Sequence, residues 1–437
     1  MRVHLAYGER GLDVELPDEA VVLEPQRVAG LPDPEGAVAE AIARPLGSPP
    51  LRELVRSGDG STSLTTGRVA IVVSDVTRPV PNRLLLPPIL EAVHGAGVPP
   101  AIGGVVIIIG TGMHRASTPE EVERVLGPEI AASYEVVNHD ARDKSTLGYL
   151  TTTARGVEVW VNRRYLEAEV RIVTGFVEPH LFAGYSGGGK AVLPGVAGAE
   201  IVMSNHGADM LGHPKATWCV TEGNPIFEEM RDIALLTRPT FCLNVTLNER
   251  REITGVFAGE LVAAHQAGIA QAERQYVRPI PHLFDIVVST NMGYPADLNL
   301  YQSVKGMSVA ARAAREGGAI VLAAECRDGL GLAEYTELLT SPDLSGPQAL
   351  LERIHSPGFA RYDQWGVQCQ AMVQAKADCW LYSSMPRETT EAAHLHYCED
   401  MSETVQELCR RHLAEHGREA TVAVLPHGHL TVPRLTA

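Results

Sequence analysis

An α/β fold is first indicated by the segment V-A-I-V-V-S-D-V-T-R-P-V-P-N, which runs from Val69 to Asn82. Its first five residues are apolar and mostly β-branched, as is typical of a strand buried on both faces of a parallel sheet. A polar segment that contains Asp75 and Arg78 follows at once. Because ligands bind beyond the carboxyl ends of strands in open α/β sheets, we expect this segment to contribute to a site. Arg78 suits a two-pronged bond to a carboxylate, and the alternative is a polar surface turn.

Apolar runs and helical patterns alternate along the rest of the chain. Further strands are predicted at Val105–Ile109, Val170–Thr174, Ile286–Ser289 and Ile320–Ala323. Helices are predicted at Leu84–His94, Pro225–Leu236, Leu300–Glu316 and Met401–His416. This alternation predicts two α/β domains with largely parallel sheets flanked by helices. The stiff segment Arg278-Pro279-Ile280-Pro281 places the boundary near 277, with a larger domain at 1–276 and a smaller one at 277–437.

The 437-residue chain has a globular composition, with 45% hydrophobic and 21% charged residues. Its net charge of −16 opposes binding to phosphate backbones and anionic lipid, so we expect neither nucleic acid nor a membrane as partner. The seven Cys residues are odd in number and never spaced C-x-x-C, which argues against a disulfide framework and a thiolate zinc site. The N-terminus lacks the apolar run of a signal peptide, and we expect a reduced, cytoplasmic protein.

A second polar cluster, G-T-G-M-H-R, follows the strand predicted at Val105–Ile109. It resembles the start of a dinucleotide fingerprint, but Arg115 stands where the third glycine belongs, so a Rossmann site is rejected. His114 is a candidate acid or base, because imidazole titrates near neutral pH. The alternative is a structural histidine.

The richest cluster is E-P-H-L-F-A-G-Y-S-G-G-G-K-A-V-L-P-G-V-A-G, from Glu178 to Gly198. Ala191 stands where a nucleotide-hydrolysing P-loop has Ser or Thr, which argues against a P-loop at this segment. Gly187 and Gly188 would let the backbone approach a ligand and offer N–H groups to a phosphate. Lys190 would be a point charge or a nucleophile that bonds a cofactor, and the alternative for the whole stretch is a tight glycine turn.

The fourth cluster, N-L-Y-Q-S-V-K, enters the helix predicted at Leu300–Glu316. Tyr301, Gln302 and Lys305 share one edge of that helix, whose N-terminus suits an anion, although a solvated helix face is the alternative. Two alternating histidine pairs, His394 with His396 and His427 with His429, lack further ligands at metal spacing and are interpreted as surface or terminal residues.

Together with Ser204-Asn205-His206, these clusters resemble the nickel-dependent lactate racemase family in order and spacing. The resemblance implies a two-domain α/β enzyme with its active site in the interdomain cleft and a cofactor-binding N-terminal domain. It also implies nickel and a pyridinium-3,5-bisthiocarboxylic acid mononucleotide, the nickel-pincer nucleotide, linked covalently to Lys190. The carried-over roles are acid/base catalysis for His114 and His180; nickel ligation for His206; substrate binding for Arg78, Tyr301, Gln302 and Lys305; and cofactor contacts or orientation for Lys190, Asp75, Gly187 and Gly188.

The implied activity is racemisation or epimerisation of a small 2-hydroxy acid by proton-coupled hydride transfer through a 2-keto acid. Two bases make physical sense, because both faces of one carbon need equivalent chemistry. Proteins that make the cofactor are implied partners besides the 2-hydroxy acid. Gly189 departs from the family pattern, in which Arg is frequent, and puts one contact in doubt. The alternatives are a nicotinamide-dependent 2-hydroxy acid oxidoreductase and a non-catalytic cofactor- or anion-binding protein.

Overall fold

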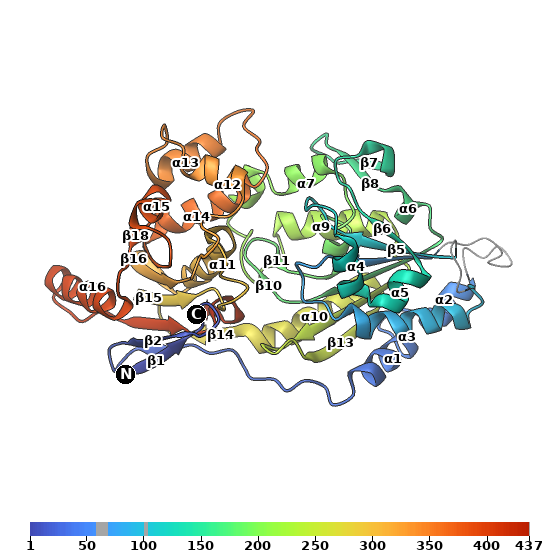
Figure 1. Cartoon of the computed structure of the whole chain (residues 1–437), viewed down its shortest axis with the longest axis horizontal. Helices are drawn as coiled ribbons and strands as arrows, with labels where there is room; N and C mark the ends of the chain where they lie inside the picture. The colour runs from blue at the N-terminus through green and yellow to red at the C-terminus, as the bar shows by residue number, and fades with distance from the viewer. Residues whose placement is uncertain (58–68, 100–103, 437) are drawn as a thin grey trace. The chain divides into compact units, whose positions relative to one another are not determined.

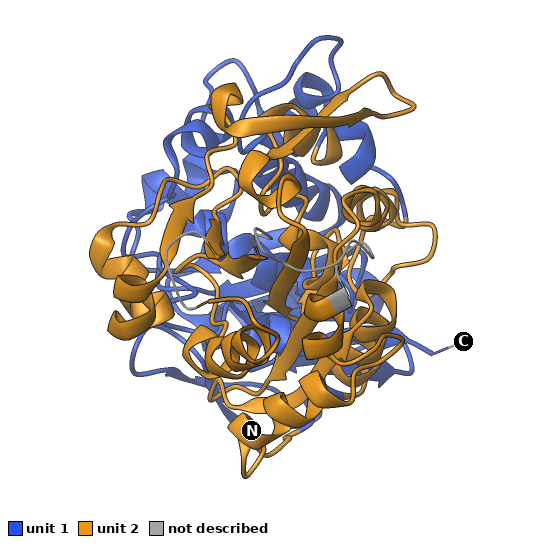
Figure 2. Cartoon of the chain, turned by 90° about the vertical axis from the view of Figure 1, so that its right-hand side faces the viewer, with its two compact units in different colours: residues 1–26, 207–214, 275–437 blue, residues 27–206, 215–274 orange. Residues whose placement is uncertain are grey.

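The computed structural model describes residues 1–57, 69–99 and 104–436, and these form two compact units. Unit 1 comprises residues 1–26, 207–214 and 275–437, and unit 2 comprises residues 27–206 and 215–274 (Figure 2). The chain enters the last part of unit 1 at Gln275, close to the division predicted near residue 277. It differs from that division at the N-terminus and at residues 207–214, because both segments pack with the C-terminal unit.

Long-range pairing explains why the first residues leave the N-terminal half. Strands β1 (Arg2–Leu5) and β2 (Leu12–Glu15) form an antiparallel hairpin, whose Val3 and Val14 enter the same apolar core as Ile286. Strand β3 (Val21–Val22) then pairs with β19 (Val422–Leu425) in parallel. Such pairing across nearly the whole chain leaves no signal in local sequence.

Unit 2 is built on a six-stranded sheet with the order β13-β12-β9-β4-β5-β6. Figure 1 labels β5, β6 and β13 of this sheet. Its strands are β4 (Val69–Ser74), β5 (Val105–Gly110), β6 (Glu135–Asn138), β9 (Val170–Phe176), β12 (Phe241–Leu247) and β13 (Ile253–Gly259). All neighbours are parallel except β12 and β13, which are antiparallel. The strands predicted at Val69, Val105 and Val170 are confirmed, as is the largely parallel α/β class.

Alternate residues of these strands point to opposite faces of the sheet, and both faces are covered. On one face Val69, Ile71 and Val73 pack into a core shared with helices α1 (Pro34–Ala43), α2 (Leu51–Ser57) and α3 (Asn82–Gly95). The remaining elements of unit 2 are α4 (Pro119–Leu126), α5 (Pro128–Ser133), η1 (Lys144–Thr146), β7 (Leu147–Thr152), β8 (Glu158–Asn162), α6 (Arg163–Leu166), β10 (Pro179–His180), β11 (Gly184–Tyr185), η2 (Gly188–Ala191), α7 (Ala199–Asn205) and α9 (Pro225–Leu236). Helix α10 (Leu261–Tyr276) ends where unit 1 resumes.

Unit 1 contains a second six-stranded sheet, with the order β18-β17-β16-β15-β19-β3 and parallel pairing throughout. Its remaining strands are β15 (Phe284–Thr290), β16 (Ala314–Ala323), β17 (Asp378–Tyr382) and β18 (His396–Tyr397), and a separate pair joins β14 (Val277–Ile280) to β20 (Val432–Leu435). Its helices are α8 (Ala208–Leu211), α11 (Leu300–Ala310), α12 (Ala333–Leu339), α13 (Gly346–Ile354), α14 (Gln364–Lys376), α15 (Arg387–Ala392), α16 (Met401–His416) and η3 (Gly428–Leu430).

One predicted helix is wrong at its end. The prediction carried the helix from Leu300 to Glu316, but α11 stops at Ala310 and the chain enters β16 at Ala314. Gly317, with φ +70°, lies at a register shift between β15 and β16 rather than at a helix C-terminus. Glycine permits this backbone in a β-bulge as readily as in a helix cap, so the residue type alone did not distinguish the two. Within the described ranges, no helix is both long and apolar enough to cross a bilayer.

Candidate functional site

Asp75 and His114 meet at the carboxyl ends of two adjacent strands. Ser74 of β4 lies opposite Gly110 of β5 in parallel register, so the loops after these strands emerge side by side. His114 Nδ1 lies 2.8 Å from Asp75 Oδ2. An ionised carboxylate only accepts hydrogen bonds, so Nδ1 carries the proton and Nε2 of the neutral ring is left as the proton acceptor.

Asp75 is buried yet stays ionised. Burial alone would raise its pKa, but hydrogen bonds from His114 and Thr77 outweigh burial and hold the pKa of Asp75 below its usual range. Thr77 Oγ1 donates to Asp75 Oδ1 over 2.6 Å. Arg78 is exposed and contributes to this pKa only through its charge, since Asp75 pairs with His114 instead. In the structure, Asp75 is thus paired with His114 rather than with Arg78.

His180 and Lys190 form a second polar pair in unit 2. His180 ends β10, in a short hairpin that pairs it with Gly184. The backbone N–H of Ala183 donates to His180 Nδ1 over 3.3 Å. The other ring nitrogen, Nε2, lies 3.5 Å from Lys190 Nζ, and a lysine ammonium can only donate. Both ring nitrogens of His180 therefore face hydrogen-bond donors, whereas Nδ1 of His114 faces an acceptor.

Phe182 brings His180, Lys190 and His206 together around one ring. Its centroid lies 4.6 Å from that of His180 and 5.1 Å from that of His206, with both pairs edge-to-face. Lys190 Nζ lies 5.9 Å from the same centroid. An aromatic ring attracts a cation and excludes water, which suits a reactive amine. Phe182 was not predicted as a functional residue. Only its position in the sequence, two residues after His180, could have indicated that it lies near the site.

His206 has the tautomer of a metal ligand. It follows α7, and its Nδ1 lies 3.1 Å from the Val202 carbonyl oxygen, which can only accept. Nδ1 therefore carries the proton and Nε2 carries the lone pair, the arrangement that a backbone carbonyl typically imposes on metal-bound histidine. Burial, followed by the charge of Lys190, lowers the pKa of His206 to about 3, so the ring is neutral. Among the described residues, no group of three or more His, Cys, Asp or Glu side chains is placed to hold a metal.

The glycine loop before Lys190 packs tightly against the protein. Asn244 Oδ1 accepts the Gly188 N–H over 3.1 Å, so this N–H is used internally rather than offered to a phosphate as predicted. A Cβ on Gly188 would lie 2.1 Å from Nδ1 of the buried His265. A Cβ on Gly189 would lie 2.7 Å from the Met230 carbonyl oxygen in α9. These glycines are required by close approach within the protein.

Helix α11 of unit 1 carries Tyr301, Gln302 and Lys305. All three side chains are half-buried, whereas Val304 on the same helix is fully buried. The alternative of a fully solvated helix face is therefore wrong. Tyr301 donates from its hydroxyl to Asp363 Oδ1 over 3.0 Å, and Trp365 Nε1 donates to that hydroxyl over 3.2 Å. Burial, and then the charge of Asp363, raises the pKa of Tyr301, which remains a neutral donor.

His429 corrects another sequence interpretation. The residue lies in η3 and is buried, not at the surface as its place near the C-terminus suggested. Burial, and then the positive charge of Lys305, lowers the pKa of His429 to about 3. A neutral histidine therefore accompanies Lys305 in unit 1. The His-x-His spacing in the sequence did not indicate that His429 is buried near the charge of Lys305.

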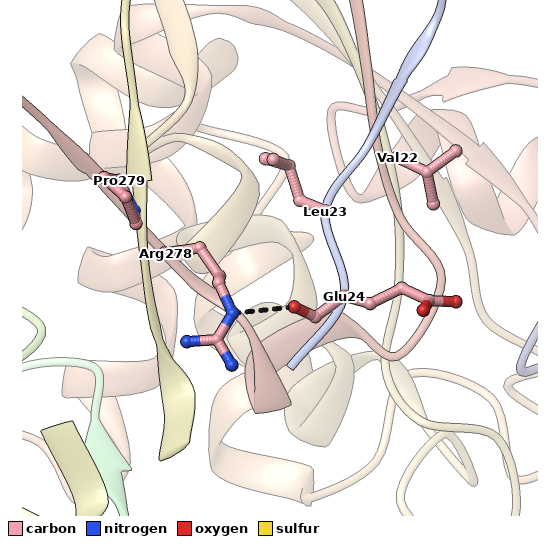
Figure 3. A pocket seen from close by; sticks show the side chains of 5 residues that line it. All are labelled: Val22, Leu23, Glu24, Arg278 and Pro279. Atoms are coloured by element: carbon pink, nitrogen blue, oxygen red, sulfur yellow. Dashed lines mark hydrogen bonds between the residues drawn. The ribbon is translucent and has the colours of Figure 1, made fainter. Parts of the chain in front are cut away.

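Two cavities lie elsewhere in the molecule. One, of about 630 Å³, is lined in unit 1 by residues that include Glu24 and Arg278, whose Nε donates to the Glu24 carbonyl over 2.9 Å (Figure 3). Another, of about 550 Å³, lies in unit 2 between residues of α1, β13 and α10. None of the predicted site residues lines either cavity.

Each unit is built on a largely parallel sheet, so the chain is an α/β protein of two units. In unit 2, Asp75 pairs with His114, and Lys190 shares one aromatic contact with His180 and His206. Side chains of these types suit acid–base chemistry. Comparisons with known proteins place the chain more narrowly. The family model described as the lactate racemase N-terminal domain matches residues 7–219, and that described as the lactate racemase C-terminal domain matches residues 281–432.

Two curated relatives named lactate racemase are similar over most of their length. The protein from Thermoanaerobacterium thermosaccharolyticum is 33% identical, with 85% of each chain covered, and that from Lactiplantibacillus plantarum is 31% identical, with 98% of each covered. The solved lactate racemase apoprotein of T. thermosaccharolyticum matches with a TM-score of 0.90 and 29% identity, covering 99% of this chain and 100% of that one. A Thermotoga maritima protein shares the fold, with a TM-score of 0.66 and 17% identity over 94% of this chain and all of that one. The chain belongs to the lactate racemase family, a family of isomerases.

Proposed function

We propose that this protein racemises or epimerises a small 2-hydroxy acid, with a nickel-pincer nucleotide as cofactor. One observation carries the proposal: the Asp75 carboxylate leaves His114 with a lone pair on Nε2, while His180 lies beside the Lys190 amine. His114 can therefore act as a base, and His180 is proposed as the second acid/base residue. A racemase needs a base for one enantiomer and an acid for the product of the other face, and this pair would supply both.

The side chains present fit the proposed cofactor. His206, buried and neutral with its lone pair on Nε2, suits nickel, which imidazole binds well. One histidine alone makes no metal site, so the proposal assigns the other ligands to the cofactor's thio-acid groups. Lys190 would attach covalently: its amine replaces the oxygen of one thiocarboxylic acid, and water leaves as the thioamide forms. When bound, the group supplies a hydride acceptor at the substrate carbon.

The protein's own residues then handle the protons and the carboxylate. His114 Nε2 takes the hydroxyl proton of one enantiomer, and Asp75 stabilises the imidazolium that results. His180 Nε2 returns a proton to the carbonyl oxygen of the 2-keto acid when its other face is reduced, and the roles reverse for the opposite enantiomer. Arg78 is proposed to bind the substrate carboxylate in a two-pronged bond, and Tyr301, Gln302 and Lys305 to contact substrate and cofactor.

The oxidoreductase alternative is weakened by the loop after β5. A dinucleotide fingerprint opens a helix directly, with its third glycine packed against the strand. Here Arg115 occupies that position and forms two 2.7 Å bonds with Glu121, while α4 starts only at Pro119. Activity with added NAD and without nickel would favour the alternative.

The test is production of the protein together with the proteins that make the cofactor. Intact mass, nickel content and racemisation of a panel of 2-hydroxy acids, lactate among them, are then measured. We expect an adduct at Lys190, about one nickel per chain, and interconversion of the enantiomers of at least one acid. Lys190→Arg, which keeps the charge but lacks a primary amine, is the control and should carry no adduct. An unmodified, nickel-free wild-type protein under these conditions would contradict the proposal.

A further inference from the structure

The loop that carries Lys190 is held by two buried side chains from other elements of unit 2. Its residues Ser186 to Gly189 are all buried, whereas Lys190 itself is half-buried. Gly187 and Gly188 have φ of +81° and +52°, so the loop has a backbone that most residues avoid. A loop of this kind depends on outside contacts to keep a single conformation.

His265, on α10, supplies the first contact. Its Nε2 lies 2.8 Å from the carbonyl oxygen of Ser186, which can only accept, so Nε2 carries the proton. The ring packs directly on Gly188, and it stacks with Phe227 of α9 at 5.7 Å and 25°. Burial lowers the pKa of His265 to about 4, which keeps the ring neutral at ordinary pH. The imidazole thus holds the Ser186 carbonyl by a hydrogen bond and fills the space beside Gly188.

Asn244, on β12, supplies the second contact. Its Oδ1 accepts the Gly188 N–H over 3.1 Å, and its Nδ2 donates to Cys242 Sγ over 2.6 Å, so the amide is held in one orientation. A Cβ on Gly187 would lie 2.7 Å from the same Oδ1. Asn244 is 1% exposed, so bulk water does not compete for these hydrogen bonds in the folded protein. The Ser186 carbonyl before Gly187 and the Gly188 N–H after it are therefore both hydrogen-bonded to side chains of other elements.

We propose that His265 and Asn244 are positioning residues that hold the Ser186–Gly189 backbone in the conformation that places the Lys190 amine for covalent attachment of the cofactor. This inference rests on the proposed function, because it concerns the same lysine. Neither side chain touches the reacting atoms; each acts through the loop. Bond formation at Nζ is sensitive to position, since a displacement near 1 Å can cost roughly a hundredfold in rate.

The test compares two substitutions that separate hydrogen bonding from packing. His265→Leu removes the donor while retaining an apolar side chain, and His265→Gln keeps an N–H donor for the Ser186 carbonyl. Asn244→Ala removes the acceptor of the Gly188 N–H from the other side. His94→Leu is a matched control: His94 is half-buried in the same unit and is hydrogen-bonded to Val98 and Tyr134.

Two measurements are made on each variant. Hydrogen exchange of the peptide that contains Gly188 is followed in the protein produced without cofactor. The fraction of Lys190 carrying the adduct is measured after production with the cofactor-making proteins. We expect His265→Leu and Asn244→Ala to speed exchange in this peptide and to slow adduct formation, each on the order of tenfold, the equivalent of one lost hydrogen bond. His265→Gln and His94→Leu should stay near wild type in both.

The outcomes are distinguishable. Normal adduct formation in both His265→Leu and Asn244→Ala, beside a loaded wild type, would overturn the positioning role. If His265→Gln and His265→Leu lose adduct formation equally, His265 acts only through packing, and the positioning role by hydrogen bonding is overturned. An unloaded wild type would instead contradict the proposed function. If His265→Leu fails to fold, Asn244→Ala and the His265→Gln rescue still decide the question.

Discussion

Nδ1 of His114 donates to Oδ2 of Asp75 over 2.8 Å, joining the loops that follow two neighbouring parallel strands. Asp75 is 5% exposed, and its ionised state is maintained by this bond and by Thr77. The carboxylate thus selects the His114 tautomer. In the proposed mechanism, the same relationship would orient the ring of His114 as a general base and stabilise it once protonated.

Asp75→Asn should lower the turnover of racemisation by roughly a thousandfold, because the amide retains the shape but no longer enforces Nδ1–H or stabilises the imidazolium. Cofactor loading should be unchanged, as measured by intact mass. Thr77→Ala, which removes only the bond to the other carboxylate oxygen, is the milder control. Wild-type turnover in Asp75→Asn would show that the tautomer of His114 does not matter.

His114→Ala and His180→Ala should each abolish racemisation from both enantiomers while leaving the cofactor bound. The reason is that each enantiomer needs one residue as base and the other as acid. Chiral chromatography, started separately from each pure enantiomer, measures the rates, and nickel content checks loading. Full activity in either variant would remove the two-base mechanism.

Gly189→Ala and Gly189→Arg should both impair the protein. A Cβ there would lie 2.7 Å from the Met230 carbonyl oxygen, so α9 or the loop has to move. We expect a loss of stability of about 1–3 kcal/mol, typical of overpacking, and a smaller adduct fraction at Lys190. Gly95→Ala is the control, because a Cβ there meets only the flexible end of Arg52. A Gly189→Arg protein as stable and as fully loaded as wild type would contradict this expectation.

Acid should destabilise the protein partly through His265. The pKa of His265 is lowered to about 4 by burial, whereas an unfolded histidine titrates near about 6.5. Between these values the unfolded chain binds a proton that the folded protein does not, so stability falls as the pH drops through this window. From about pH 7 to about pH 5, wild type should lose about 2 kcal/mol more than His265→Gln.

Urea unfolding of both proteins at the two pH values measures this difference. The other buried histidines are common to both proteins and cancel in the comparison. Parallel acid sensitivity of wild type and His265→Gln would mean that His265 is protonated in the folded state.

Asp285→Asn should destabilise unit 1 strongly. The buried carboxylate accepts 2.8 Å bonds from both Nη atoms of Arg418 and bonds from the backbone N–H and hydroxyl of Thr421. These bonds outweigh burial and hold the pKa of Asp285 well below its usual range. Removing the charge leaves the donors of Arg418 and Thr421 without a matching acceptor, which should lower the free energy of unfolding by about 3 kcal/mol.

Thermal unfolding at neutral pH measures this loss, with Glu407→Gln as control, because Glu407 pairs with Arg410 at the exposed surface of α16. A melting temperature equal to wild type would show that the Asp285 cluster is not stabilising. Racemisation at a permissive temperature should persist, since Asp285 has no role in the proposed chemistry.

Local sequence was sufficient for much of the fold and for the family. Helices α9 and α16 begin and end as predicted, because Asn224 and Asp400 cap their N-termini and Gly417 adopts the left-handed conformation that ends α16. The buried strands were recognisable from β-branched runs. His114, His180, Lys190 and His206 were identified with the family from ordered motifs.

Other features were invisible at that level, because they depend on residues distant in the chain. The helix predicted at Leu300–Glu316 would end just before Gly317, and only the pairing of β16 with β15 shows that Gly317 lies at a register shift between two strands. His429, interpreted as a terminal residue, is buried near the charge of Lys305. The glycines before Lys190 suggested a surface for a ligand, but the Gly188 N–H is taken by Asn244 and its Cα lies against His265.

Residue order alone thus determined the α/β class, the main strands and the family, since periodicity, capping and motif spacing are properties of short segments. Tertiary structure decided which unit holds residues 1–26, because β3 finds its partner only in β19. It also decided the tautomer of His114, which follows from the group that faces its Nδ1: the Asp75 carboxylate, from the loop after another strand. A hydrogen bond depends on distance and direction in space, and those are fixed only once the chain has folded.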